Sequence, residues 1–286
     1  MTTFGGRLRA SFDADGPLCV GIDPHESLLD SWGLPATAAG ARDFGLRVVD
    51  AARGRVGIVK PQVAFFERFG GDGFHALEDV FAAARDAGLI LIADAKRGDI
   101  GSTMTGYLDA WLTPGSPLEA DALTVSPYLG PESLRAAYAT AVRHDKGLFV
   151  LAATSNPHAD VLQAAQTVDV AAADGQTVAA RVAVDIDEVN RSAAFGGGLG
   201  AIGVVIGATV NRAALHLDDE LLARTPILAP GFGAQGAVPA ALGSLFGAVA
   251  GNVVASESRS ILSAGPDGLA ARIDERQALY GGNRDA

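Results

Sequence analysis

Residues 88–103 read Gly88-Leu-Ile-Leu-Ile-Ala-Asp94-Ala-Lys96-Arg-Gly-Asp99-Ile-Gly-Ser-Thr103, an apolar run that passes into charged groups. The apolar part is short and starts at a glycine, which predicts a buried strand over 89–93. Side chains two apart on a strand share a face, so we expect Asp94 and Lys96 to point the same way. Asp99 lies beyond the next turn and off that face. It must therefore return through the loop or serve a neighbouring chain.

Seven further apolar runs recur along the chain, and helical patterns separate them. Strands that alternate with helices are expected to be parallel and joined by crossovers. The alternation predicts an α/β fold, a single-domain (β/α)8 TIM barrel over 1–286. The predicted strands are 18–23, 56–61, 89–93, 122–126, 147–152, 203–207, 226–230 and 252–255, and the predicted helices include 40–54, 73–87, 102–112, 131–144, 174–195 and 236–247.

Three segments lie outside this alternation. Residues 1–15 carry phenylalanine and leucine at a spacing of four, which predicts a short helix that caps the lower end of the barrel. Residues 160–200 include a long helical stretch and a glycine-rich break, and we interpret them as an elaborated connection. Residues 281–286 are polar and glycine-rich, so a frayed tail is expected.

Composition argues against several classes of partner and site. The formal net charge of −11 would repel a nucleic-acid backbone or an anionic membrane surface, so neither is expected to bind. No run has the form of a signal peptide or a membrane span, which predicts a cytoplasmic protein. Cys19 is the only cysteine, so no internal disulfide can form. The five histidines are isolated in the sequence, and no metal site is predicted.

Lysine is rare in this chain, and its positions are informative. Of 22 basic residues only Lys60, Lys96 and Lys146 are lysines, and the first two end predicted strands. An arginine is permanently charged, whereas the pKa of a lysine moves with burial, so proton transfer requires lysine where simple charge does not. A buried Lys60 would need carboxylate partners, which makes Asp23 and Asp94 its expected neighbours.

Polar side chains also end the other early strands. Asp23 follows the first strand, Ser126 the fourth, and Thr154-Ser155-Asn156 the fifth. The carboxyl ends of barrel strands form one face of the molecule, and active sites are built there. Polar residues after strands also form ordinary turns. A turn is the better interpretation of Ser126, whereas a turn and a site explain Asp23 equally well.

A glycine-rich loop follows the seventh predicted strand. Its sequence, Pro230-Gly231-Phe-Gly233-Ala-Gln235-Gly236, leads into a predicted helix, so its N–H groups are expected to cradle a phosphate. Phosphate sites of such barrels use the loops after strands seven and eight, and this position carries more weight than the glycines themselves. Arg259, shortly after the eighth strand, would add a bidentate guanidinium.

Five motifs, in this order, resemble those of the orotidine 5'-phosphate decarboxylase family, and specifically its longer-chain branch common in actinobacteria and some other bacteria. The resemblance spans nearly the whole chain. The motifs are Val20-Gly-Ile-Asp23-Pro, Val59-Lys60-Pro-Gln-Val-Ala-Phe-Phe-Glu67, Asp94-Ala-Lys96-Arg-Gly-Asp99-Ile, Thr154-Ser155-Asn156-Pro and Pro230-Gly-Phe-Gly-Ala-Gln235-Gly.

The resemblance implies a cofactor-independent carboxy-lyase that converts orotidine 5'-phosphate to UMP and CO2, the last step of de novo UMP biosynthesis. Loss of CO2 from C6 leaves a carbanion outside the π system, without the electron sink that a cofactor provides. The family implies that Lys96 is the proton donor, flanked by Asp94, with Lys60 in the same charged network. The ammonium of Lys96 would stabilise the carbanion and then protonate it.

The family also implies a homodimer with active sites at the interface. Asp99 and Thr103 would reach into the partner subunit's site. The surroundings of Arg259 depart from the pattern, because Ser256-Glu-Ser-Arg-Ser-Ile261 replaces the Gly-Arg of the shorter-chain branch. The remaining implied contacts are Asp23 with the ribose, Ser155 with the pyrimidine ring, and Gln235 with Arg259 at the phosphate.

Three other functions remain open on the sequence. A related phosphosugar barrel, such as a 3-keto-gulonate-phosphate decarboxylase or a hexulose-phosphate synthase, has a similar Asp-x-Lys-x-x-Asp motif and would need Mg²⁺. A class I aldolase would form a Schiff base on Lys60 or Lys96. A non-enzymatic barrel would bind phosphorylated nucleotides and keep the Asp/Lys cluster as a structural ion-pair network.

Overall fold

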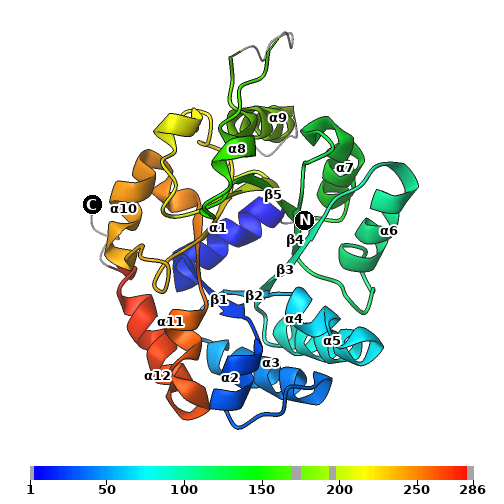
Figure 1. Ribbon diagram of the computed structural model, residues 1–286, viewed down its shortest axis with the longest axis vertical. Coiled ribbons are helices and arrows are strands. Elements are labelled where there is room, and N and C mark those ends of the chain that lie inside the picture. Colours follow the sequence, from blue (N-terminus) through cyan, green and yellow to red (C-terminus); the bar gives the residue numbers. More distant parts are fainter. Residues whose placement is uncertain (1–2, 169–174, 193–197, 282–286) are drawn as a thin grey trace.

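The computed structural model describes residues 3–168, 175–192 and 198–281, and a closed barrel of parallel strands forms its centre (Figure 1). Each strand pairs with the next one in the sequence, and the last strand closes on the first. Helices cover the outside of the barrel and side chains fill it, so the strands are buried on both faces. The predicted (β/α)8 TIM barrel is confirmed. The strands are β1 Leu18–Ile22, β2 Ile58–Pro61, β3 Ile90–Arg97, β4 Ala122–Val125, β5 Gly147–Ala153, β6 Ile202–Ile206, β7 Ile227–Pro230 and β8 Val253–Glu257.

Helices and short 3-10 turns follow each strand and form the outer ring of Figure 1. They are α2 Glu26–Ser31, α3 Ala38–Ala52, α4 Ala64–Glu67, α5 Gly70–Asp86, α6 Gly101–Trp111, η1 Pro131–Leu134, α7 Arg135–Arg143, α8 Asp160–Gln163, α9 Val178–Ser192, η2 Ala213–Leu215, η3 Pro239–Ala241, α10 Leu242–Phe246, η4 Gly247–Asn252, α11 Arg259–Leu262 and α12 Gly265–Ala278.

The remaining helix, α1 (Phe4–Asp15), lies across the end of the barrel where the strands begin. The ring of Phe4 packs edge-on against Phe149 of β5, with centroids 6.2 Å apart. Arg7 Nη1 lies 2.6 Å from the carboxylate of Asp121, just before β4. These contacts close the lower end of the barrel, so a ligand site must be built at the opposite rim.

Two of the peripheral segments are only partly described. The segment 160–200 contains α8 and α9, whereas 169–174 and 193–197 lie outside the described residues. Of the expected frayed tail, 282–286 also lie outside them. Within the described part of the chain, no helix is long and apolar enough to cross a bilayer.

Candidate active site

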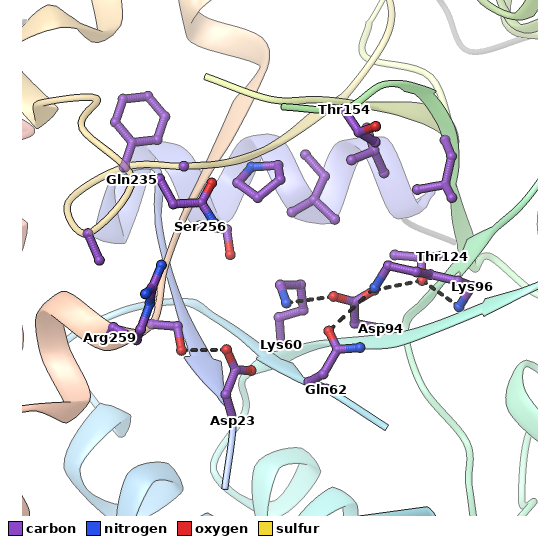
Figure 2. Close-up of a pocket in the computed structure, with 18 residues that line it drawn as sticks. Asp23, Lys60, Gln62, Asp94, Lys96, Thr124, Thr154, Gln235, Ser256 and Arg259 are labelled. Carbon is purple, nitrogen blue, oxygen red and sulfur yellow. Dashed lines mark hydrogen bonds and ion pairs between the residues drawn. The ribbon is translucent and has the colours of Figure 1, made fainter. Parts of the chain in front are cut away.

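A cavity of about 280 Å³ lies at the carboxyl ends of the strands, on the side of the barrel opposite α1 (Figure 2). Every strand, or the residue directly after it, contributes to the wall of the cavity. The sequence-predicted site residues that line it are Asp23, Lys60, Asp94, Lys96, Gly231, Gln235 and Arg259.

The carboxylate of Asp94 links the charged groups at one end of the cavity. Lys60 Nζ donates to Asp94 Oδ2 at 2.8 Å, and Lys96 Nζ donates to Asp94 Oδ1 at 2.5 Å. Thr124 Oγ1 donates to the same Oδ1 at 3.0 Å. Figure 2 shows this cluster with Gln62, whose Oε1 lies 3.4 Å from Lys96 Nζ. Asp94 therefore fixes the positions of both ammonium groups.

A bulge in β3 brings Asp94 and Lys96 together. The pairing of β3 with β4 shifts register between Ala93 and Arg97, and Lys96 has a φ of +49°. This left-handed conformation is uncommon for a residue with a Cβ and costs on the order of 1 kcal/mol. The Lys96 N–H donates to Thr124 Oγ1 at 2.9 Å, which holds the bend. The prediction that the side chains of Asp94 and Lys96 point the same way is confirmed. They do so because the strand is bulged, and not because of the regular alternation of a strand.

Burial and charge act in opposite directions on this cluster. Only 6% of Lys60 and 8% of Asp94 is exposed, whereas 45% of the Lys96 side chain is exposed. Burial disfavours the ammonium of Lys60, but the carboxylates of Asp94 and Asp23 outweigh it and raise the pKa of Lys60. Burial likewise disfavours the carboxylate of Asp94, but Lys60 and Lys96 outweigh it and lower the pKa of Asp94. Lys60 and Asp94 are therefore both charged at neutral pH.

Asp23 lines the same cavity, and only one of its two carboxylate oxygens has a hydrogen-bond partner among the described residues. Ser258 Oγ donates to Asp23 Oδ2 at 2.5 Å. The other oxygen, Oδ1, is buried and has no hydrogen-bond partner among the described residues. Asp23 itself lines the cavity, so its carboxylate is placed to accept from a hydroxyl of a ligand.

The opposite end of the cavity is cationic. Arg259 is exposed there, and no ion pair joins it to any residue that the structure describes. Gly231 and Gln235 of the loop after β7 line the same end. Ser155 Oγ donates to Gln235 Oε1 at 3.3 Å, so the loops after β5 and β7 meet at the rim although Ser155 does not itself line the cavity. An unpaired guanidinium beside a glycine-rich loop is suited to an anion.

Gly233, which the sequence assigned to the phosphate cradle, is not among the lining residues. Its N–H donates to the carbonyl of Ala237 at 2.8 Å, within the loop. Its φ is +73°, and a Cβ at this position would lie 2.5 Å from Ser260 Oγ. Gly233 therefore allows the loop to pack closely on the residues after β8, and its neighbours Gly231 and Gln235 face the cavity.

Asp99 and Thr103 lie outside the cavity of their own chain. Asp99 Oδ1 accepts from the Ile100 N–H at 2.8 Å, and Thr103 is exposed in the first turn of α6. Both are therefore free of contacts that would prevent them from reaching another molecule.

The sequence missed four polar residues of the cavity, Gln62, Thr124, Ser256 and Ser258. Gln62 and Ser258 directly follow β2 and β8. The rule that selected Asp23 at a strand end would also have selected them. Thr124 lies inside β4, where a β-branched residue is an ordinary strand former, so its sequence carries no signal. Within the described residues no group of three or more histidine, cysteine, aspartate or glutamate side chains is placed to hold a metal ion.

Comparison with known proteins identifies the family. Residues 16–272 match the sequence model of the "Orotidine 5'-phosphate decarboxylase / HUMPS family". The orotidine 5'-phosphate decarboxylase of Salinispora tropica is 46% identical over 98% of this chain and 100% of its own length, and that of Nocardioides sp. is 49% identical over 92% of both chains. A crystal structure from Streptomyces avermitilis, named for the same enzyme, is 45% identical, has a TM-score of 0.92, and covers 100% of this chain and 97% of its own. The chain therefore belongs to the orotidine 5'-phosphate decarboxylase family.

Proposed function

We propose that this protein converts orotidine 5'-phosphate to UMP and CO2 in pyrimidine biosynthesis, without a cofactor or a metal ion. The observation that carries the proposal is the Lys96 ammonium, which borders the cavity and is held by a carboxylate that Lys60 keeps ionised. The family match and the relatives of nearly equal length support the same reaction.

Lys96 supplies both the electrostatic stabilisation and the proton. When the bond between C6 and the carboxylate breaks, CO2 leaves and the electron pair stays on C6. The ammonium of Lys96 stabilises that carbanion and transfers one N–H proton to it, which gives UMP and a neutral amine. Because 45% of the Lys96 side chain is exposed, solvent can restore the proton before the next turnover.

Asp94 acts through Lys96. Its bond to Lys96 Nζ aims the ammonium, and its bond to Lys60 keeps it charged. Repulsion between Asp94 and the substrate carboxylate would add about 4 kcal/mol at roughly 4 Å and an effective dielectric near 20. That is too little to account for the decarboxylation of a very unreactive carboxylate, so positioning is the larger role.

The ribose and the phosphate bind along the cavity, away from the lysines. The carboxylate of Asp23, which lines the cavity, accepts from the ribose. Ser155, which lies at the rim and bonds to Gln235, contacts the pyrimidine ring. Arg259, Gln235 and Gly231 line the other end of the cavity and bind the phosphate. Binding energy from the phosphate, remote from C6, can be used to hold the ring in its reactive orientation.

We also propose a homodimer in which Asp99 and Thr103 complete the partner subunit's site. Ile100 and Leu129 are 59% and 55% exposed, and Tyr128 is 78% exposed. The Ser126 N–H donates to the Arg97 carbonyl, so the two loops that carry these residues adjoin. Large apolar side chains grouped at the rim support a covered surface there.

The decisive experiment follows the absorbance of orotidine 5'-phosphate with purified protein and no added metal. We expect conversion to UMP that is unchanged by EDTA. A flat trace from folded dimer would overturn the proposal. Activity that EDTA abolishes would indicate the Mg²⁺-dependent phosphosugar reaction, and borohydride trapping of substrate on a lysine would indicate the aldolase.

A further inference from the structure

Glu257, the last residue of β8, has a fully enclosed carboxylate that the proposed reaction does not use. Only 1% of the residue is exposed. Arg276 donates to both of its oxygens, from Nε to Oε2 at 2.8 Å and from Nη2 to Oε1 at 2.9 Å. Tyr280 Oη donates to Oε1 at 2.7 Å, and Ser260 Oγ donates to Oε2 at 2.5 Å. Each oxygen thus accepts two hydrogen bonds.

Stability alone does not explain such a group. Removing a carboxylate and a guanidinium from water is costly, and apolar residues of similar volume often pack as stably. Buried ionic networks are better suited to fixing one arrangement among several similar ones. Glu257, Arg276, Tyr280 and Ser260, which we call the Glu257 network, are therefore suited to holding a neighbouring part of the molecule in place.

The network lies directly behind the anion-binding end of the cavity, which we call the anion corner and define as residues 230–236 and Arg259. A Cβ on Gly233 would lie 2.9 Å from Glu257 Oε2, so the backbone of the loop rests on the carboxylate. The ring of Phe232, which lines the cavity, packs edge-on against Tyr280 with centroids 5.9 Å apart.

The same network sets the position of Arg259. Glu257 and Ser260 are bonded through their side chains, which closes the short turn that carries Arg259 between them. Burial and the neighbouring carboxylate raise the pKa of Tyr280, so its phenol remains a donor across the working pH range. This arrangement accompanies the Glu-Ser-Arg sequence that replaces the Gly-Arg of the shorter-chain branch.

We propose that Glu257 is a positioning residue for phosphate recognition: with Arg276, Tyr280 and Ser260 it holds the anion corner in its binding arrangement before the substrate arrives. The proposal rests on the proposed function, because it takes Arg259 and the loop after β7 to be the phosphate site. A corner fixed in advance avoids the cost of ordering the loop and the guanidinium on binding.

The test is the Tyr280→Phe variant, which keeps the ring against Phe232 and removes one hydrogen bond from Glu257. We expect KM for orotidine 5'-phosphate and Kd for UMP to rise by up to roughly tenfold, the equivalent of one net hydrogen bond. The affinity for uridine, which lacks the phosphate, should not change. The control is Asp274→Asn on α12, the helix that ends just before Tyr280. The partner of Asp274, Arg55 at 3.3 Å, precedes β2 and lies away from the anion corner.

Glu257→Gln should raise KM and the Kd for UMP more than Tyr280→Phe does. If Glu257→Gln does not fold, the measurements on Tyr280→Phe decide the matter. A lower midpoint of thermal unfolding with unchanged Kd for UMP would show a purely structural role and overturn the proposal. An equal loss of UMP and uridine affinity would do the same. If the wild-type protein binds UMP but does not turn over orotidine 5'-phosphate, the proposed function fails, while the comparison of UMP with uridine still tests Glu257.

Discussion

Lys96 differs from Lys60 in exposure, although both bond to the same carboxylate. The Lys60 side chain is 8% exposed and that of Lys96 is 45% exposed, so only Lys96 combines a fixed position with access to substrate and solvent. This difference in exposure supports the proposed roles, Lys96 as the proton donor and Lys60 as the residue that keeps Asp94 charged.

We expect Lys96→Ala to lower kcat/KM by at least about 10⁴-fold, since it removes both the proton donor and the cation that stabilises the carbanion. Circular dichroism and the unfolding midpoint should remain close to those of the wild type, because 45% of the side chain is exposed and Asp94 keeps its bond to Lys60. Lys96→Arg keeps the charge but not a proton that can be transferred, so it should be similarly inactive. A tenth of the wild-type rate in Lys96→Ala would rule out this role.

The lowered pKa of Asp94 gives a stability prediction with a definite sign. The ionised Asp94 carboxylate contributes fully to the free energy of unfolding at any pH above the ordinary carboxyl pKa. This contribution is lost as the pH falls toward the lowered pKa of the folded state. Removing one partner of a buried pair costs about 3–5 kcal/mol, so Asp94→Asn should be less stable by about that amount at neutral pH. In urea unfolding, the gap between the two proteins should narrow below about pH 4. A gap of unchanged size at pH 3 would contradict this assignment.

At the residue scale, the sequence located the groups that end strands and could not locate those that depend on loop shape. Asp23, Lys60, Asp94 and Lys96 line one cavity because the carboxyl ends of parallel strands meet. Glu257 also ends a strand, but that position does not indicate its role, which depends on Arg276, 19 residues later on another helix.

At the element scale, the loop after β7 contains two glycines that look alike in the sequence but differ in the fold. Gly233 has a φ of +73° and lies against Ser260 and Glu257. Gly236 has a φ of +104°, and a Cβ added there would point into open space, with no contact within 4 Å. The loop therefore has one side that packs and one that is free.

Gly233→Ala is expected to displace this loop, because its methyl group would overlap Ser260 Oγ in addition to straining the backbone. Backbone strain alone costs roughly 1–3 kcal/mol, which is all that Gly236→Ala should show in its free energy of unfolding. Gly233→Ala should also raise KM for orotidine 5'-phosphate several-fold more than Gly236→Ala does. Equal effects of the two substitutions on KM would contradict the packing described here.

Prediction of elements succeeded where burial is periodic. All predicted strands and helices overlap observed ones, but 236–247 is divided among η3, α10 and η4, because Pro239 starts a 3-10 turn and Gly247 has a φ of +55°. The expected helices did not include α12. Its buried residues are only Leu269 and Ile273, which is too narrow a stripe to indicate a helix from sequence.

At the scale of the whole molecule, the offset of Asp99 becomes a prediction about subunit exchange. In a two-fold dimer, Lys96→Ala and Asp99→Ala chains should be inactive alone, whereas each mixed dimer contains one site with both residues intact. Random mixing makes about half of the dimers mixed, so about a quarter of wild-type activity should return if Lys96 acts in its own subunit and Asp99 acts across the interface. Mass spectrometry verifies the exchange, and no recovery after it would refute the shared site.

The helix α1, which lies across the start of the strands, limits the route by which substrate and products can enter and leave the barrel. With Phe4 fully buried against Phe149, the lower end offers no exit. In the proposed reaction, the incoming nucleotide, the UMP and the CO2 must then all pass through the opening at the carboxyl ends of the strands. CO2 has to pass outward beside a bound UMP, and the next substrate has to wait until that UMP has left. Substrate entry and product release therefore take place at the same end of the barrel.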